Sequence, residues 1–540
     1  MSCSPFAHKL TTNYVPTIDE IAQISRLLVE PLDQLRRLDA EISRLQQSID
    51  ELTAKRQRLD EFITPHQALL SPIRRIPQEV LQEIFLRCLP TNHNSVMSCR
   101  EAPLLLGRVC SLWRSLSMTM PALWSSIYIS VPQPTTAAWE GVNIAVLTQA
   151  VTEWLSRSGT LPLSITLYHT TARTEEQPLV QYMVSLCSRW KHVDLSLSTF
   201  TYPLITSLTK EDVPLLESCS FRTPTLGLSA TYDISFKNPP EVLQAHCLRR
   251  LLIPSFMVPL NIPNWSALAE VLVVQGSFVT LHGLRIDAAL SVLRHCQSLV
   301  VCTLALTEAN ISVNELPVVT VPNLKTLALH GGHGMGSFLE RLRLPALCNL
   351  ELKVNSVSIE TNPVPLYSFL SRVVALESFT LTFAYQTRET LTALIARLPD
   401  IAQLFINIRG GWSSPERDKA LFDDEVLALL EARKDNPVLP RLKAIECRPS
   451  SVSPDALFSF IESRTTYSSR FGVNRLDRVS FELPEKGKDI FPALSEVVAE
   501  GTEVIITYEE KPPAPRWIFN PRGNLDRSVP RLSRASQLRV

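Results

Sequence analysis

The stretch VPNLKTLAL at residues 321–329, followed by LPALCNLELKV at residues 344–354, states one design twice. Each segment begins at a proline-containing corner, continues through an apolar anchor and about two polar residues, and ends in a run of alternating apolar and polar residues. Such alternation is typical of a short β-strand that buries one face. Repetition of the whole design is typical of a repeat architecture.

The design recurs through the region from residue 150 to residue 510. Ten further copies begin at Trp154, Arg189, Val213, Leu248, Leu268, Leu299, Ala375, Ile401, Leu439 and Leu476. Helical patterns lie between several of them, as in IDAALSVLRHC before Leu299 and DALFSFIESR before Leu476. We therefore expect an irregular α/β solenoid that resembles leucine-rich repeats. A compact α/β domain with a parallel sheet is the alternative, because the regular asparagine ladder of well-formed leucine-rich repeats is missing.

A small helical module is expected upstream, at residues 66–130. Pro77 stands where a helix accepts proline best, and Glu79 follows in the first turn, where negative charge suits the helix dipole. Apolar residues then recur at helical spacing, at Val80, Leu81, Ile84, Phe85 and Cys88. A second apolar helix follows Pro103. Two short helices bury little surface, so part of this face is expected to meet a partner.

Four motifs follow one another in this module: Ile76-Pro77-x-Glu79, Ile84-Phe85, Val109-Cys110-x-x-Trp113-Arg114 and Pro121-x-Leu123-Trp124. In this order they resemble an F-box, of the kind found in F-box-like proteins of fungal type. Two features depart from the pattern. Ile76 stands where leucine is usual, and the polar connection from Pro90 to Pro103 resembles an insertion between the helices. An ordinary helical hairpin inside a larger all-α domain is the alternative.

The resemblance implies a partner and a function. An F-box joins a Skp-family adaptor, and a cullin through it, so the chain is expected to be the substrate-recognition subunit of an SCF-type cullin-RING ubiquitin ligase. By resemblance, the adaptor-binding residues are Ile76, Pro77, Val80, Leu81, Ile84, Phe85, Val109 and Trp113. An unidentified target protein would bind the repeat domain. The alternative function is a non-catalytic scaffold that assembles through the N-terminal helix and the repeats, without ubiquitin transfer.

A heptad seam lies upstream of the module, at residues 31–65. Its apolar positions follow alternating steps of three and four, at Leu35, Leu38, Ile42, Leu45, Ile49, Leu52, Leu59 and Ile63. Arg56 occupies the one slot that breaks the series. Pro31 is expected to begin the helix and Pro65 to end it. So narrow a stripe favours self-association as a coiled coil, with docking on the chain's own core as the alternative.

Composition bounds the class of protein. The 540 residues carry 53 basic and 53 acidic side chains, so no net charge favours nucleic acid as a partner. The sequence has no signal-peptide pattern and no uninterrupted apolar run of about 18 residues, so a cytoplasmic or nuclear chain without membrane association is expected. The eleven cysteines are odd in number and never spaced as Cys-x-x-Cys, which is typical of reduced thiols.

No catalytic motif stands out, and we expect neither an enzyme nor a cofactor. Two metal-like sets occur, Cys88 with His93 and Cys99, and His330 with His333, but zinc usually needs three or four well-placed ligands, so no metal site is predicted. The acidic run Asp423-Asp424-Glu425 is interpreted as the N-cap and first turn of a helix.

The sequence thus predicts a multidomain α+β chain. Its expected parts are a flexible N-terminus at 1–30, a coiled-coil helix at 31–65, an F-box-like domain at 66–130, a leucine-rich-repeat-like recognition domain at 150–510 and a disordered basic tail at 511–540. The tail is expected to lack structure because it combines prolines, arginines and serines with few large apolar residues.

Overall fold

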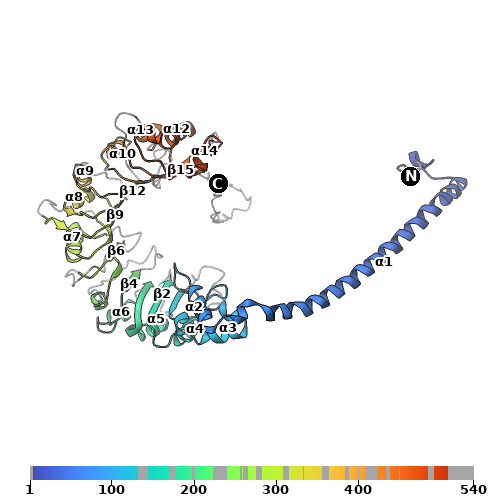
Figure 1. Ribbon diagram of the computed structural model, residues 1–540, viewed down its shortest axis with the longest axis horizontal. Coiled ribbons are helices and arrows are strands. Elements are labelled where there is room, and N and C mark those ends of the chain that lie inside the picture. The colour runs from blue at the N-terminus through green and yellow to red at the C-terminus, as the bar shows by residue number, and fades with distance from the viewer. Residues whose placement is uncertain are drawn as a thin grey trace, which may run out of the picture. The chain divides into compact units, whose positions relative to one another are not determined.

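The computed structural model (Figure 1) divides into two compact units, Met1–Ile84 and Phe85–Val540, and the division falls within helix α2 (Gln78–Arg87). The expected tail at 511–540 lies outside the described residues. Those residues are 4–131, 144–169, 177–196, 201–222, 240–255, 258, 265–274, 283–307, 316–332, 334–354, 364–383, 388–398, 400–408, 422–432, 438–448, 450–483, 490 and 492–508.

The N-terminal unit consists mainly of α1 (Ile18–Leu70), one helix of 53 residues that follows the short 3-10 turn η1 (Ala7–Lys9). It begins at Ile18 because Thr17 and Glu20 form a capping box. The Thr17 amide donates to the Glu20 carboxylate at 2.8 Å, and the Glu20 amide donates to the Thr17 hydroxyl at 3.4 Å. The expectation of a flexible segment up to residue 30 is therefore wrong for residues 18–30.

The helix also runs through both prolines that were expected to bound it. Pro31 and Pro65 lie inside α1. Each removes one backbone hydrogen bond and costs a helix interior about 3 kcal/mol. Good helix formers lie near both positions, among them Glu30 and Leu32 beside Pro31 and Glu61 and Gln67 near Pro65, and the helix continues through both prolines. Figure 1 shows the result as one gently curved helix.

The expected F-box-like module consists of short helices. They are η2 (Pro72–Arg75), α2, η3 (Leu106–Arg108), α3 (Ser111–Met118) and η4 (Pro121–Trp124). In the C-terminal unit, the Phe85 and Trp113 rings lie 4.8 Å apart between centroids, and the buried Trp124 indole donates to the Ser117 carbonyl at 2.9 Å. Phe85 of α2 is therefore packed against α3, and Trp124 of η4 is bonded to the last turn of α3.

The polar connection between α2 and α3 is ordered and joins the sheet. Val96 forms a parallel bridge with Tyr128, and the Tyr128 amide donates to the Ser95 carbonyl at 2.8 Å. The Asn94 amide group donates to the Thr166 hydroxyl at 2.9 Å. The connection thus covers the first edge of the sheet, an edge that would otherwise expose unpaired backbone groups.

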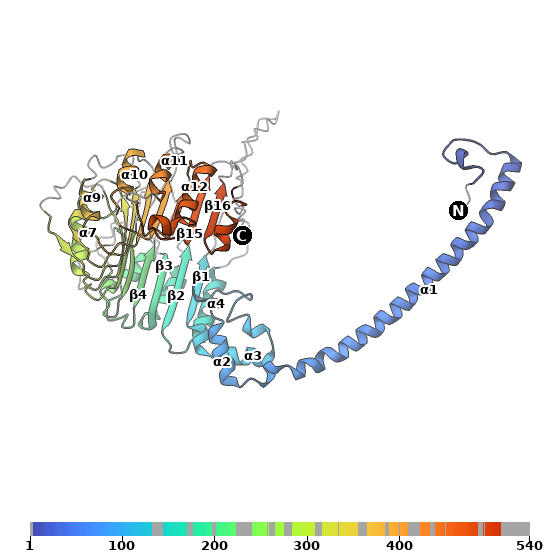
Figure 2. The same ribbon diagram turned by 45° about the horizontal axis from the view of Figure 1, so that its top comes forward.

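Fourteen parallel strands form one sheet among the described residues, in the order β1-β2-β3-β4-β5-β6-β7-β9-β11-β12-β13-β14-β15-β16. This sequential order is that of a solenoid, and it excludes a compact doubly wound domain. Figures 1 and 2 show the strands lining the inner side of a curve, with helices outside. The strands are β1 (Ser126–Val131), β2 (Leu163–His169), β3 (Trp190–Ser196), β4 (Ser218–Arg222), β5 (Arg250–Pro254), β6 (Glu270–Val274), β7 (Val301–Ala305), β9 (Thr326–Gly331), β11 (Asn349–Val354), β12 (Ser378–Phe383), β13 (Gln403–Ile408), β14 (Ala444–Arg448), β15 (Arg478–Leu483) and β16 (Glu503–Tyr508).

The remaining elements connect these strands. A separate two-stranded pair joins β8 (Val319–Thr320) and β10 (Leu342–Arg343). The connecting helices are α4 (Ile144–Ser156), α5 (Gln177–Val184), η7 (Cys187–Arg189), α6 (Tyr202–Thr206), η8 (Glu241–Gln244), α7 (Ile286–His295), α8 (Met335–Glu340), α9 (Val364–Leu370), α10 (Arg388–Ile395), α11 (Asp424–Leu430), α12 (Pro454–Arg464), α13 (Ser468–Phe471) and α14 (Ser495–Ala499).

Strand alternation builds the core between the sheet and the helices. The parallel pairing sets equivalent residues of neighbouring strands side by side. One such set, with one residue from each strand, forms a continuous buried row. That row contains Ile127, Ile165, Val193, Cys219, Leu251, Val271, Cys302, Leu327, Leu350, Phe379, Leu404, Ile445, Val479 and Val504. A second buried row lies two residues further along the strands.

A chain of backbone hydrogen bonds takes the place of the missing asparagine ladder. In successive repeats, one carbonyl just before the strand accepts two amides from the next repeat. The Glu217 carbonyl accepts from Arg249 and Arg250, and the Arg249 carbonyl accepts in turn from Ala269 and Glu270. The same arrangement continues to Lys443, which accepts from Asp477 and Arg478. Backbone groups thus link each of these repeats to the next at the same position.

All twelve segments that carry the repeated design contain a strand, so the expected solenoid is confirmed as an architecture. The sequence prediction missed both outer strands. The expected boundary at residue 130 falls inside β1, because SIYISV alternates like the other strands. The last strand, β16, follows a turn at Gly501 (φ 100°) and so has no proline corner before it.

Candidate binding surfaces

Helix α2 carries two adjacent apolar stripes. Leu81 and Phe85, four residues apart, are 3% and 0% exposed. Val80 and Ile84, also four apart, are 48% and 37% exposed, and Pro77 is exposed one turn earlier. The helix therefore buries one stripe and leaves the neighbouring stripe open.

A second set of exposed apolar residues lies at the start of α3, in the C-terminal unit. Val109 and Leu112 are exposed, whereas Trp113 is half-buried against Phe85. The Cys110 thiol caps the helix by accepting a hydrogen bond from the Trp113 amide at 3.5 Å. This cap fixes the turn that holds Val109 and Leu112 outward.

The eight residues predicted to bind an adaptor therefore differ in exposure. Pro77, Val80, Ile84 and Val109 are exposed, and Ile76 and Trp113 are intermediate. Leu81 and Phe85 are buried, so in this conformation they can support the surface but cannot form it. The sequence does not distinguish the two stripes, because a helix that is apolar on two adjacent stripes does not reveal which stripe faces inward.

The inner face of the repeat sheet is the other candidate surface. Side chains that alternate with the buried rows point away from the helices and align across the strands. The middle aligned row contains Tyr128, Thr166, Asp194, Ser220, Leu252, Leu272, Thr303, Ala328, Glu351, Thr380, Phe405, Glu446, Ser480 and Ile505. Hydroxyl, acidic and apolar groups thus share one continuous face.

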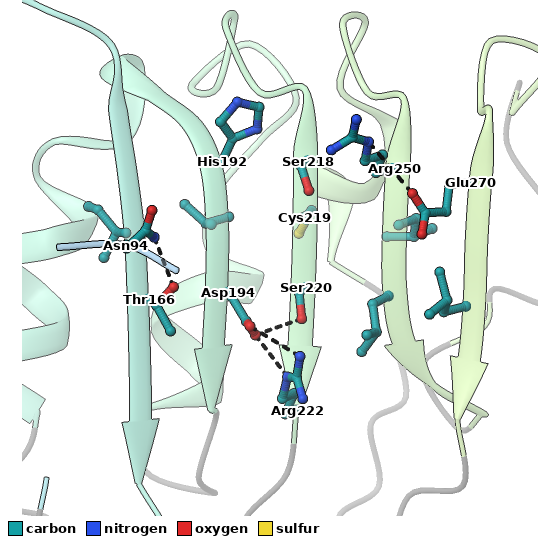
Figure 3. A pocket seen from close by; sticks show the side chains of 15 residues that line it. Asn94, Thr166, His192, Asp194, Ser218, Cys219, Ser220, Arg222, Arg250 and Glu270 are labelled. Carbon is teal, nitrogen blue, oxygen red and sulfur yellow. Dashed lines mark hydrogen bonds and ion pairs between the residues drawn. The ribbon is translucent and has the colours of Figure 1, made fainter. Parts of the chain in front are cut away.

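A pocket of about 270 Å³ opens on this face over β2 to β6 (Figure 3). The Asp194 carboxylate accepts from the Ser220 hydroxyl at 2.6 Å and from Arg222 Nε at 3.0 Å. Arg250 Nε lies 3.6 Å from the Glu270 carboxylate. Opposite charges are therefore paired inside the pocket. Its apolar lining includes Leu252 and Leu272, next to these pairs.

Two residues of the pocket resemble a catalytic pair, and their environment argues against that role. Burial lowers the pKa of His192; Glu217 opposes the shift, while Lys191 and Arg250 add to it. Cys219 belongs to the buried row, and its burial raises the thiol pKa far above the usual range, with a further contribution from Asp194. At neutral pH the cysteine is a thiol packed in the core, which is a poor nucleophile.

The other catalytic or metal-binding candidates in the sequence have structural roles where they lie within the described ranges. The Asp423 carboxylate accepts from the amides of Glu425 and Val426, at 3.1 and 3.2 Å, which confirms the N-cap of α11. Arg388 pairs with the same carboxylate at 2.5 Å. Among the described ranges, no three His, Cys, Asp or Glu side chains are grouped so that they could hold a metal ion. His333 lies outside those ranges.

Comparison with known proteins gives only distant similarities. No protein family model matches the sequence, and no curated protein matches it. The chain is similar to an internalin from Listeria monocytogenes, at 12% identity and a TM-score of 0.27, over 67% of this chain and 83% of that chain. It is also similar to a protein from Bacteroides fragilis, at 11% identity and a TM-score of 0.26, over 67% of this chain and 75% of that chain. The strand order and the parallel register of this chain themselves show a repeat solenoid.

Among the described residues, no helix combines the length and the apolar character that a membrane-spanning segment requires. The longest, α1, carries charged side chains in every few turns.

Proposed function

We propose that this chain is a substrate receptor of an SCF-type ubiquitin ligase, joined to a Skp-family adaptor by residues 66–130 and to a target protein by the inner face of its repeats. The observation that carries the proposal is the exposed stripe of Val80 and Ile84 on α2, with exposed Pro77 just before the helix, next to a stripe that is already buried. Because one apolar stripe of the helix is already buried in the core, the second, exposed stripe is available to bind a partner.

The order of motifs supports the choice of partner. The exposed residues of α2, and Val109 at the start of α3, fall on positions that resemble the adaptor contacts of an F-box. Each fully buried aliphatic side chain adds about 1.5 to 3 kcal/mol, and these residues begin only partly exposed, so each would add somewhat less. The polar connection from Pro90 to Pro103 pairs with the sheet edge, so it does not weigh against the adaptor contact.

The inner face of the sheet is suited to the target. Its middle row combines hydroxyl and acidic side chains with apolar positions such as Leu252, Leu272 and Phe405. Such surfaces recognise a protein by many side-chain contacts rather than by reaction chemistry. The ligase chemistry would reside in the other subunits.

A co-purification experiment tests the proposal. The full-length chain is co-expressed with a Skp-family adaptor and a cullin, together with the variants Ile84→Asp and Val374→Asp. Val374 is the matched control because it is 92% exposed and lies in the repeats, outside the module. We expect adaptor and cullin with the unchanged chain and with Val374→Asp, and a loss of both with Ile84→Asp, because a charge cannot enter an apolar interface without a partner.

The scaffold alternative predicts a different result. A scaffold retains its target through the repeats but brings no cullin with it. Binding of the adaptor that Ile84→Asp leaves unchanged would contradict the proposed interface. Absence of both proteins from the unchanged chain would contradict the receptor function itself, and the scaffold function would then be favoured.

A further inference from the structure

The apolar seam of α1 is exposed to solvent along the helix. Its eight predicted residues, from Leu35 to Ile63, are each between 42% and 64% exposed. Because α1 extends past both prolines, the same spacing adds Ile21, Ile24 and Leu28 at the start and Leu70 at the end. A long helix gains its stability mainly by packing an apolar stripe, so this stripe requires a covering surface.

Three positions in the seam determine which partner helix, and in which orientation, can cover it. Pro31, Arg56 and His66 occupy heptad positions where the other residues are aliphatic. In a parallel pair of identical helices in register, each residue meets its own copy. Arg56 would then face a second Arg56, and two like charges would be buried together. A parallel homodimer is therefore disfavoured by this sequence.

We propose that α1 pairs with α1 of a second copy of the chain in antiparallel orientation, with Leu45 opposite Ile49 of the other copy at the centre. The central layers run symmetrically outward in both directions. They join Ile42 with Leu52, Leu38 with Arg56, Leu35 with Leu59, Pro31 with Ile63, Leu28 with His66, and Ile24 with Leu70. Each of the three irregular residues then meets an aliphatic side chain instead of its own copy.

Charge complementarity along the flanks selects this register. Glu41 of each helix lies opposite Lys55 of the other, and Asp39 lies next to the layer that contains Arg56. In the monomer Glu41 pairs with Arg44 at 2.7 Å and Arg56 with Asp60 at 3.6 Å. Both pairs are highly exposed and contribute little, so they can exchange partners.

The two antiparallel registers that are shifted by one heptad are less favourable for association than the proposed register. A shift of one heptad in one direction sets Asp39 against Asp60, and a shift in the other sets Arg56 against Pro31. Like charges that face each other across an interface oppose association. The proposed register keeps α1 paired from Ile24 to Leu70 and is independent of adaptor binding.

Two glutamate substitutions in the full-length chain test the orientation. Leu45 faces an aliphatic residue in this register, so Leu45→Glu buries two unpaired carboxylates. Leu38 faces Arg56, so Leu38→Glu creates two opposite-charge pairs instead. Both positions are exposed in the monomer, at 50% and 61%, so neither substitution removes a contact that the monomer needs.

Sedimentation equilibrium of the three full-length proteins measures the outcome, with circular dichroism as the check on helix content. We expect a dimer for the unchanged chain, an increase of more than about a hundredfold in the dimer dissociation constant for Leu45→Glu, and a change of less than about tenfold for Leu38→Glu. A monomer at about 100 µM of the unchanged chain would overturn the pairing. Equal weakening by both substitutions would overturn the antiparallel register, because a parallel pair brings glutamates together at either position.

Discussion

Arg464, at the end of α12, is a buried cation whose removal should loosen one repeat. Its side chain is 0% exposed, and it donates to the carbonyls of Leu430 and Val438, and to that of Leu439 at 2.9 Å. Leu439 has a φ of 50°, a left-handed conformation that leucine rarely adopts. The guanidinium therefore joins the end of α11 to the strained segment that leads into β14.

The magnitude of the change Arg464→Met follows from these contacts. Three carbonyls would lose their donor, at about 2 kcal/mol each. Burial lowers the pKa of Arg464 to about 10, so the charged form is disfavoured by about 3 kcal/mol, and its removal recovers that amount. We expect a net local destabilisation of about 3 kcal/mol. The matched control is Arg470→Met, because Arg470 is exposed and lies 5.9 Å above the Phe471 ring.

Native-state hydrogen exchange is the appropriate assay because a solenoid opens repeat by repeat. With Arg464→Met, amides at 438–448 should exchange about a hundredfold faster than in the unchanged protein, while those of β3 and β4 should keep their rates. Arg470→Met should leave both regions unchanged. Unchanged exchange at 438–448 in Arg464→Met would contradict this prediction, because it would show that the three carbonyls do not depend on the guanidinium.

The hydrogen bond from Lys9, followed by those from Thr17 and Tyr14, lowers the pKa of Glu20 from 4.5 to about 2. The Glu20 carboxylate therefore stabilises the start of α1 fully above pH 4.5, and this stabilisation is lost as the pH falls towards 2. A carboxyl chemical-shift titration that gives an ordinary pKa for Glu20 would contradict the capping box. Cys110→Ala should destabilise α3 by about 1 kcal/mol in urea unfolding, whereas Cys110→Ser should retain the cap, and equal effects would argue against capping by the thiol. Exposed thiols such as Cys88 should react with maleimide within minutes in the native protein while core thiols such as Cys219 stay unlabelled, as mass spectrometry would show; early labelling of Cys219 would mean that the buried row is open.

The sequence allowed the strands to be predicted because alternation is a local signal. Segments such as those ending in β9 and β11 carry the apolar anchor and the strand within about ten residues of one another, and the parallel registers then follow from matching patterns. The cap of α11 was predictable for the same reason, since Asp423 and the amides it accepts from lie within three residues.

Other features were harder to predict from the sequence, because opposing local signals competed or because the residues involved lie far apart along the chain. The capping box in Thr17-Ile18-Asp19-Glu20 is a local signal for the start of α1, whereas Pro31 and Pro65 are local signals for helix ends, and the helix extends past both prolines. The pocket over β2 to β6 joins residues as far apart as Asn94 and Glu270, and their proximity depends on a register that no local pattern specifies.

Calorimetric titration of the full-length chain with a purified Skp-family adaptor measures the proposed interaction itself. We expect a one-to-one complex with a Kd below about 1 µM, close to −8 kcal/mol or tighter, and a loss of at least about tenfold in affinity for Ile84→Asp but not for Val374→Asp. Absence of binding by the unchanged chain, or equal affinities for all three proteins, would contradict it.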